Sequence, residues 1–276
     1  MRMRTILAGL LVLGLAWPAL AQEPILQIVL TPGQASAIPS KSGVAYANGG
    51  IIDVAQPNPT TVVITMSGLT ATNADLCRTS VANYAFELMQ GFEVRMDPRL
   101  KGAKLTLEGR VIGLLRTDHE LYTHAHHICK KCGTAETHEA VAVVAACEGP
   151  EVVALHLPAR SAAGCCDDLS IYNYEGPITV PVTAGKYTLH ETWGFGTTHP
   201  AFCCRGASAE FSPQPYVLPL PGSYWFEHWQ PFNGAATKDF GYQVTLKLIP
   251  EFKPLDDKGP EEVPPPKDKE KPAPKE

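Results

Sequence analysis

The sequence predicts an all-β fold, an antiparallel β-sandwich stapled by disulfide bonds, and three observations support this prediction. Apolar residues alternate with polar ones in about ten short segments, which is the pattern of half-buried strands. The chain contains 23 Gly and 25 Pro in 276 residues, which favours many turns over long helices. It also contains eight cysteines. Two packed sandwich-like halves are the alternative within this fold class.

The N-terminal segment 1–21 is predicted to be a cleavable secretory signal. Arg2 and Arg4 precede an apolar run, and Ala19-Leu20-Ala21 supplies small residues at the expected cleavage site. The apolar run is shorter than the ~20 residues that a membrane-spanning helix needs. We therefore expect a mature chain that starts at Gln22, is secreted or periplasmic, and has no transmembrane segment.

Residues 22–252 are predicted to form the β-rich globular region. Alternation is clearest in Gly241–Ile249 and Lys186–Trp193. The other runs are Ile25–Leu30, Thr61–Met66, Tyr84–Leu88, Phe92–Met96, Lys104–Arg116, Ala140–Ala146, Val152–Leu157 and Ile178–Val182. Turn residues flank these runs at Asn48-Gly49-Gly50, Asp97-Pro98, Glu148-Gly149-Pro150 and Ala184-Gly185. The Ala-rich stretches Ala82–Gln90 and Glu136–Ala146 also suit a helix.

Two polar segments mark the limits of this region. Residues 253–276 are rich in Pro, Lys and acidic residues, so they cannot bury enough apolar surface to offset the entropy of ordering. We predict a disordered tail there. The segment 118–133 is polar and lacks strand character, so it is the expected boundary if the globular region is divided in two.

The charge of the chain argues against nucleic acid as a partner. The formal charge is −5, and loss of Arg2 and Arg4 with the signal would make it −7. A phosphate backbone is bound by a basic surface. The sequence leaves the partner unknown, with a component of the cell envelope or a glycan as the candidates.

All eight cysteines follow the predicted signal, and an even number in an exported chain indicates disulfide bonds. Adjacent cysteines rarely reach disulfide geometry with each other. Cys165-Cys166 and Cys203-Cys204 are therefore expected to bond elsewhere, and cross-bonding of the two pairs is a natural hypothesis. The candidates are Cys77, Cys129, Cys132, Cys147, Cys165, Cys166, Cys203 and Cys204.

Histidines and cysteines gather between residues 117 and 138. Imidazole and thiolate groups at this spacing could hold zinc or copper, with the ligand set His124, His126, His127, Cys129 and Cys132. In an oxidising compartment the two cysteines are more often bonded. A polar loop held by disulfides is thus the favoured interpretation, with no cofactor, and a metal site is the alternative.

An aromatic stretch offers a second candidate site. In an extended conformation Trp225, Glu227 and Trp229 would project from the same side of the strand, and two rings flanking a carboxylate suit stacking on and hydrogen bonding to a sugar ring. Burial of these rings in the core is the competing interpretation.

We find no catalytic motif. His138-Glu139 lacks the second histidine of a metalloprotease helix, and no Gly-x-Ser-x-Gly elbow is present. The sequence therefore predicts an exported, non-catalytic β-sandwich with a structural or binding role at the cell envelope or outside the cell. A metal-binding protein and a carbohydrate-binding or hydrolytic protein are the alternatives.

Overall fold

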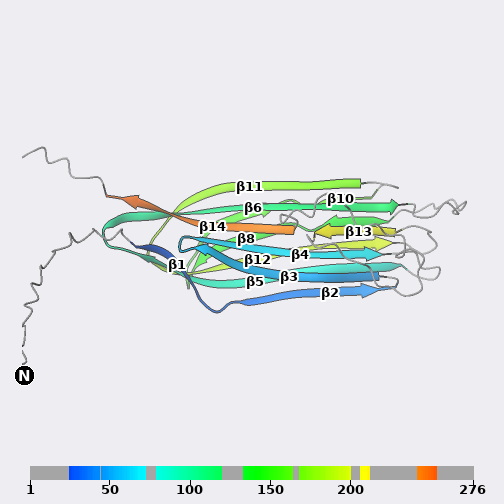
Figure 1. The fold of residues 1–276 in the computed structure, drawn as a ribbon, viewed down its shortest axis with the longest axis horizontal. Helices are drawn as coiled ribbons and strands as arrows, with labels where there is room; N and C mark the ends of the chain where they lie inside the picture. Colours follow the sequence, from blue (N-terminus) through cyan, green and yellow to red (C-terminus); the bar gives the residue numbers. More distant parts are fainter. Residues whose placement is uncertain are drawn as a thin grey trace, which may run out of the picture.

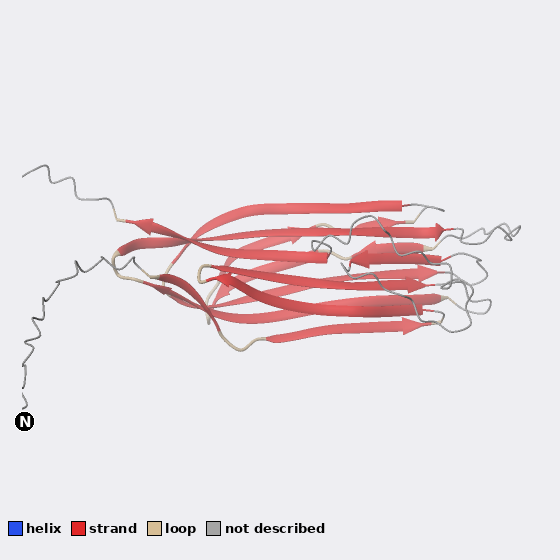
Figure 2. Ribbon diagram, in the orientation of Figure 1, coloured by secondary structure: helices blue, strands red, loops and turns tan. Residues whose placement is uncertain are grey.

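The structure is a computed structural model that describes residues 25–43, 45–72, 79–119, 133–163, 168–199, 206–211 and 241–253. Within these ranges the regular secondary structure is all β-strand, joined by turns and loops (Figure 2), which confirms the predicted all-β class. The strands are β1 (Leu26–Leu30), β2 (Gln34–Ser42), β3 (Ala45–Asn58), β4 (Thr61–Thr72), β5 (Ser80–Met96), β6 (Leu100–His119), β7 (Thr134–Thr137), β8 (Ala140–Ala146), β9 (Glu151–Leu157), β10 (Arg160–Ala162), β11 (Asp168–Val182), β12 (Gly185–His199), β13 (Gly206–Phe211) and β14 (Gly241–Phe252).

The strands form two antiparallel sheets that pack face to face (Figure 1). Sheet A has eight strands, with β5 and β12 at its centre. Strands β1 and β2 pair with one side of this centre, and β7 to β10 extend the other side. Sheet B has six strands, in which β13 and β14 lie between β4 and β6, while β3 and β11 form the edges. Each sheet contains strands from both sides of the segment 118–133.

The hydrophobic core fills the space between the two sheets. In β14, Tyr242, Val244, Leu246 and Leu248 are at most 2% exposed, as the alternation of the sequence predicts. An aromatic cluster occupies the same layer, where Phe195 contacts other rings from β5, β12 and β13. Burial of this apolar surface is the main source of stability of the sandwich.

Several predicted runs are parts of longer strands. Tyr84–Leu88 and Phe92–Met96 belong to the single strand β5, because Gly91 continues the pairing with Thr188 of β12. The two stretches that also suited a helix are strands: Ala82–Gln90 lies in β5, and Glu136–Ala146 covers the end of β7 and all of β8.

The predicted turn at Asn48-Gly49-Gly50 is wrong. These residues lie inside β3, where the pairing with β4 shifts between Asn48 and Ile51, as in a β-bulge. Gly49 has a φ of 69°, a value that glycine adopts without strain. The amide of Gly50 donates to the hydroxyl of Tyr84 at 3.2 Å, and a Cβ on Gly50 would overlap the Tyr84 ring. The two glycines therefore bend an edge strand rather than end it.

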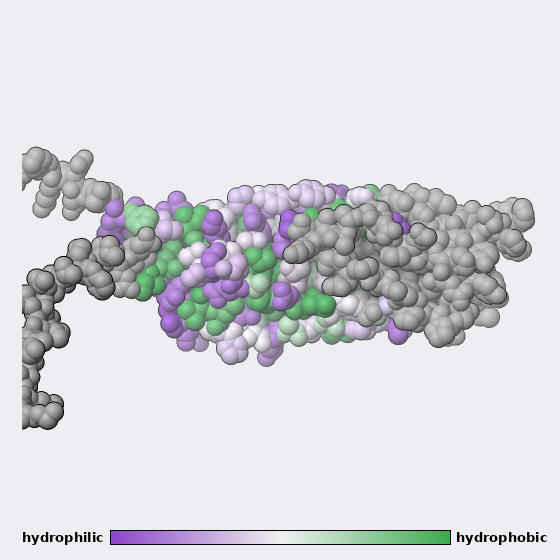
Figure 3. All heavy atoms as spheres, viewed as in Figure 1, coloured by the Kyte–Doolittle hydropathy of each residue, from purple (hydrophilic) through white to green (hydrophobic). Residues whose placement is uncertain are grey.

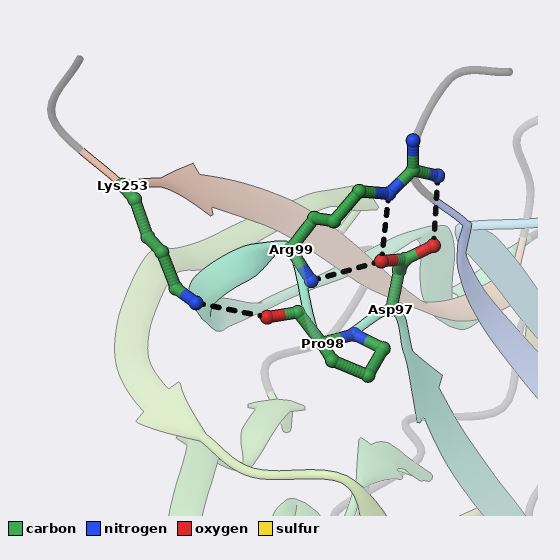
Figure 4. Close-up of polar contacts among 4 residues, drawn as sticks. All are labelled: Asp97, Pro98, Arg99 and Lys253. Carbon is green, nitrogen blue, oxygen red and sulfur yellow. Dashed lines mark hydrogen bonds and ion pairs between the residues drawn. The ribbon is translucent and has the colours of Figure 1, made fainter. Parts of the chain in front are cut away.

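The predicted turn at Asp97-Pro98 is present between β5 and β6. The Asp97 carboxylate accepts hydrogen bonds from the backbone amide and the guanidinium of Arg99 at 2.8–2.9 Å, which lowers the pKa of Asp97 to about 2. The ammonium of Lys253 donates to the carbonyl of Pro98 at 3.0 Å, as Figure 4 shows. This contact joins the residue after β14 to the β5–β6 turn.

Several predicted segments lie outside the described residues, among them the signal 1–21, the tail from residue 254 and seven of the eight cysteines. Cys147 is described. It is an exposed free thiol, 3.9 Å from the hydroxyl of Thr188. The disulfide bonds stay a prediction.

Candidate functional site

Strand pairing in sheet B assembles a polar and aromatic surface from three distant parts of the chain. Tyr174 of β11 is opposite Arg110 of β6, and Arg110 is in turn opposite Gln243 of β14. Because side chains opposite each other in a sheet point to the same face, these three lie together on the outer side of the sandwich. We call this surface the tyrosine face and define it as Glu108, Arg110, Tyr172, Tyr174, Gln243 and Thr245.

Tyr172 and Tyr174 are the most exposed features of this surface. They point outward because Ile171 and Asn173, the alternate residues of β11, are buried. Tyr172 is 71% and Tyr174 48% exposed. In Figure 3 the rim of the molecule where Figure 1 places β11 has the pale purple of mildly hydrophilic residues. Two amphipathic rings are thus presented to solvent at the edge of sheet B.

Hydrogen bonds hold the polar side chains of the tyrosine face in place. The hydroxyl of Tyr174 donates to the carboxylate of Glu108 at 3.3 Å, and the guanidinium of Arg110 donates to the side-chain carbonyl of Gln243 at 2.9 Å. The amide of Gln243 reaches the hydroxyl of Thr65 at 3.4 Å. The pKa of Tyr174 is raised by desolvation and by the charge of Glu108, so the phenol stays neutral at ordinary pH.

These side chains enclose a shallow depression of about 220 Å³. Glu108 is the only carboxylate among the described residues that line it, and Arg110 the only guanidinium. Glycoside hydrolysis generally uses a pair of carboxyl groups. The depression therefore offers the aromatic rings and the hydrogen-bond donors and acceptors of a binding site. Its described lining residues do not include the two carboxyl groups that hydrolysis of a glycoside needs.

A second unusual group is Glu191, which lies in the core. It belongs to the buried side of β12 together with Leu189 and Trp193 and has 0% exposure. Among the described residues, neither of its carboxylate oxygens has a hydrogen-bond partner, and the same is true of the indole nitrogen of Trp193 and the hydroxyl of Tyr242. Burial raises the pKa of Glu191 to about 8, so the carboxyl group is mostly protonated at neutral pH.

The site residues predicted from the sequence lie outside the described part of the chain. This applies to His124, His126, His127, Cys129 and Cys132, and to Trp225 and Trp229. Within the described ranges, no group of three or more His, Cys, Asp or Glu could hold a metal ion. Two histidines there pair with acids on the outer side of sheet A: His190 with Glu87 at 3.2 Å and His156 with Glu139 at 3.1 Å.

Sequence reasoning missed both Glu191 and the two tyrosines, although each had a local signal. The alternation in Lys186–Trp193 places residue 191 on the same side as Leu189 and Trp193, so its burial could have been predicted. Tyr172 and Tyr174 are likewise two residues apart. However, the residues before them include few large apolar side chains, so the sequence shows no clear alternation there and this part of β11 was not predicted.

Comparisons with protein-family models, curated proteins and solved structures found no match to this chain. The described residues include no helix that is long and apolar enough to span a membrane.

Proposed function

We propose that this protein is an exported, non-catalytic binding protein whose tyrosine face binds a polysaccharide. The observation that carries the proposal is the exposure of Tyr172 and Tyr174 on one side of β11, next to the hydrogen-bonded side chains of Glu108, Arg110 and Gln243. The predicted signal at residues 1–21 supports export.

The chemistry of a sugar ring matches this surface. One face of a pyranose is made of C–H groups, which stack on an aromatic ring, while the hydroxyls around its edge need hydrogen-bond partners. Tyrosine supplies a flat apolar surface with a polar end. Positions two apart on a strand are separated by about 6.8 Å, a distance comparable to the size of a sugar ring. The two tyrosines can therefore contact neighbouring sugars of one chain.

The polar groups of the tyrosine face are suited to the edges of those sugars. Arg110 and Gln243 are already fixed by hydrogen bonds to neighbouring side chains, so little side-chain entropy is lost when a ligand binds. Glu108 is the single carboxylate among the described residues that line the depression, and this favours binding over hydrolysis.

The test is a binding assay with the double variant Tyr172→Ala/Tyr174→Ala. Wild-type protein is expected to sediment with at least one of a set of insoluble polysaccharides that includes cellulose, chitin and xylan, or to be retarded in native gels that contain a soluble one. The double variant is expected to bind at least about tenfold more weakly, because each stacked ring contributes about 1 kcal/mol.

Phe252→Ala is the matched control. Phe252 is an aromatic residue of similar exposure, 65%, and its strand partner is Leu100, far along β6 from Ile112, the partner of Tyr172. This variant is expected to bind like the wild type. Unchanged binding by the double variant, or no binding of any polysaccharide by the wild type, would refute the proposal.

A further inference from the structure

A groove next to the tyrosine face runs between the edges of the two sheets. It has a volume of about 500 Å³ and lies between β10 of sheet A and β11 of sheet B. Tyr172 lines both this groove and the depression of the tyrosine face. A chain bound on the tyrosine face can therefore continue past Tyr172 into the groove.

Among the described residues that line the groove, Arg160 is the one with a cationic side chain, and this side chain is held in a defined position. Its Nε donates to the side-chain carbonyl of Asn173 at 3.1 Å, and the Asn173 amide donates to the carbonyl of Pro158 at 3.0 Å. Asn173 is only 7% exposed, and the backbone amide of Arg160 is bonded to the hydroxyl of Thr137 at 3.0 Å. The Nε end of the Arg160 guanidinium is thus fixed by the buried side-chain amide of Asn173.

The outer nitrogens of Arg160 remain available to a ligand. Arg160 is exposed, and within the described part of the chain no carboxylate lies within ion-pair distance of it. Ser161 and Ser170 also line the groove and carry hydroxyl groups that can donate hydrogen bonds. A guanidinium with hydroxyl donors beside it matches the geometry of a carboxylate, which it can bind through two parallel hydrogen bonds.

We propose that the groove is a subsite for the carboxylate of an acidic sugar, so that the polysaccharide bound by this protein is a polyuronate. This inference rests on the proposed function, because it takes the sugar next to Tyr172 as its starting point. Arg160 binds the carboxylate of the sugar that follows the stacked one. The formal charge of −5 disfavours a polyanion at long range, so selectivity for an acidic chain depends on this positioned cation.

The experiment compares polymers that have the same backbone with and without charge. Sodium polygalacturonate and sodium alginate are each paired with their methyl esters, and binding is measured by retardation in native gels and by calorimetry. Wild-type protein is expected to bind at least one acid form about tenfold or more tightly than its ester, as a charge-assisted hydrogen bond implies. Arg160→Gln is expected to lose this preference while its affinity for the ester is unchanged.

Arg95→Gln is the matched control, since it removes the same charge from an exposed position on sheet A, and it is expected to keep the preference. Arg160→Lys keeps the charge without the planar fork and is expected to recover only part of the preference. The circular dichroism spectra of all variants should match that of the wild type.

The outcomes separate the two proposals. Equal wild-type binding of acid and ester, with both lost in Tyr172→Ala/Tyr174→Ala, would overturn the Arg160 subsite and leave the tyrosine face supported. Loss of acid binding in Arg160→Gln but not in the tyrosine double variant would show that Arg160 binds the acid by itself, and it would overturn both the tyrosine face and the placement of the subsite next to a stacked sugar. Failure of the wild type to bind any of the four polymers would overturn the subsite.

Discussion

Glu191→Gln is expected to make the protein up to about 5 kcal/mol more stable than the wild type above pH 8. The cause is the burial of Glu191, which raises its pKa from 4.5 to about 8 in the folded state. Between these two values the folded state keeps a proton that the unfolded state releases. The stability of the wild type therefore falls as the pH rises through this window, and the full penalty is present above about pH 8.

Denaturant unfolding at pH 5, 6.5, 8 and 9 measures this effect. The wild type and the variant are expected to differ little at pH 5 and to diverge as the pH rises. Tyr242, the titratable group that faces Glu191 from β14, has a pKa raised well above its ordinary value of 10.0, so it stays neutral in this range. Glu151→Gln changes an exposed carboxyl group of sheet A and should leave the pH dependence as it is. If the free energy of unfolding of the wild type and of Glu191→Gln changed with pH in parallel, the raised pKa that we assign to the buried Glu191 would be contradicted.

Phe195→Ala is expected to lower the free energy of unfolding by about 3–5 kcal/mol. Phe195 is 0% exposed, and its ring lies 4.8 Å from that of Phe211 and 5.1 Å from that of Trp193, measured between centroids. A Cβ on Gly68 would be only 3.1 Å from the Phe195 ring, so the backbone of β4 packs closely against it. Removal of the ring leaves a cavity between the sheets that the neighbouring strands cannot close.

Urea denaturation monitored by tryptophan fluorescence measures this loss, and Phe252→Ala is again the control. Because the Phe252 ring is largely exposed, its removal should change the free energy of unfolding by no more than about 0.5 kcal/mol. A loss below about 1 kcal/mol for Phe195→Ala would contradict the central position that we assign to this ring.

The periodicity of the sequence was sufficient to predict the fold class and many of the strands. Gly241–Ile249 and Lys186–Trp193 are strands in which the alternating apolar residues, such as Leu246 and Leu189, are buried, because a half-buried strand needs an apolar residue at every second position. Edge strands were harder to predict. Strands β2 and β3 bury few large side chains, so the apolar signal was weak, and the glycines of β3 resembled a turn although they form a bulge.

The candidate site could be predicted only in part. Local alternation is enough to place Tyr172 and Tyr174 on one side of a strand, but it cannot identify their neighbours. Gln243 lies 133 residues from Arg110 in the sequence, yet their side chains are hydrogen-bonded. Nothing in the sequence around Gln243 indicates this contact. Arg160 is brought to Tyr172 by the packing of the edge of one sheet against the edge of the other.

The sequence by itself thus determined that this chain forms antiparallel strands and which side of many of them is buried, because both follow from the two-residue period of the extended backbone. Only the tertiary structure decided which strands pair, in which register, and hence which polar side chains meet beside the tyrosines. Pairing depends on the fit of side chains from distant segments across both sheets, and no local pattern contains that information.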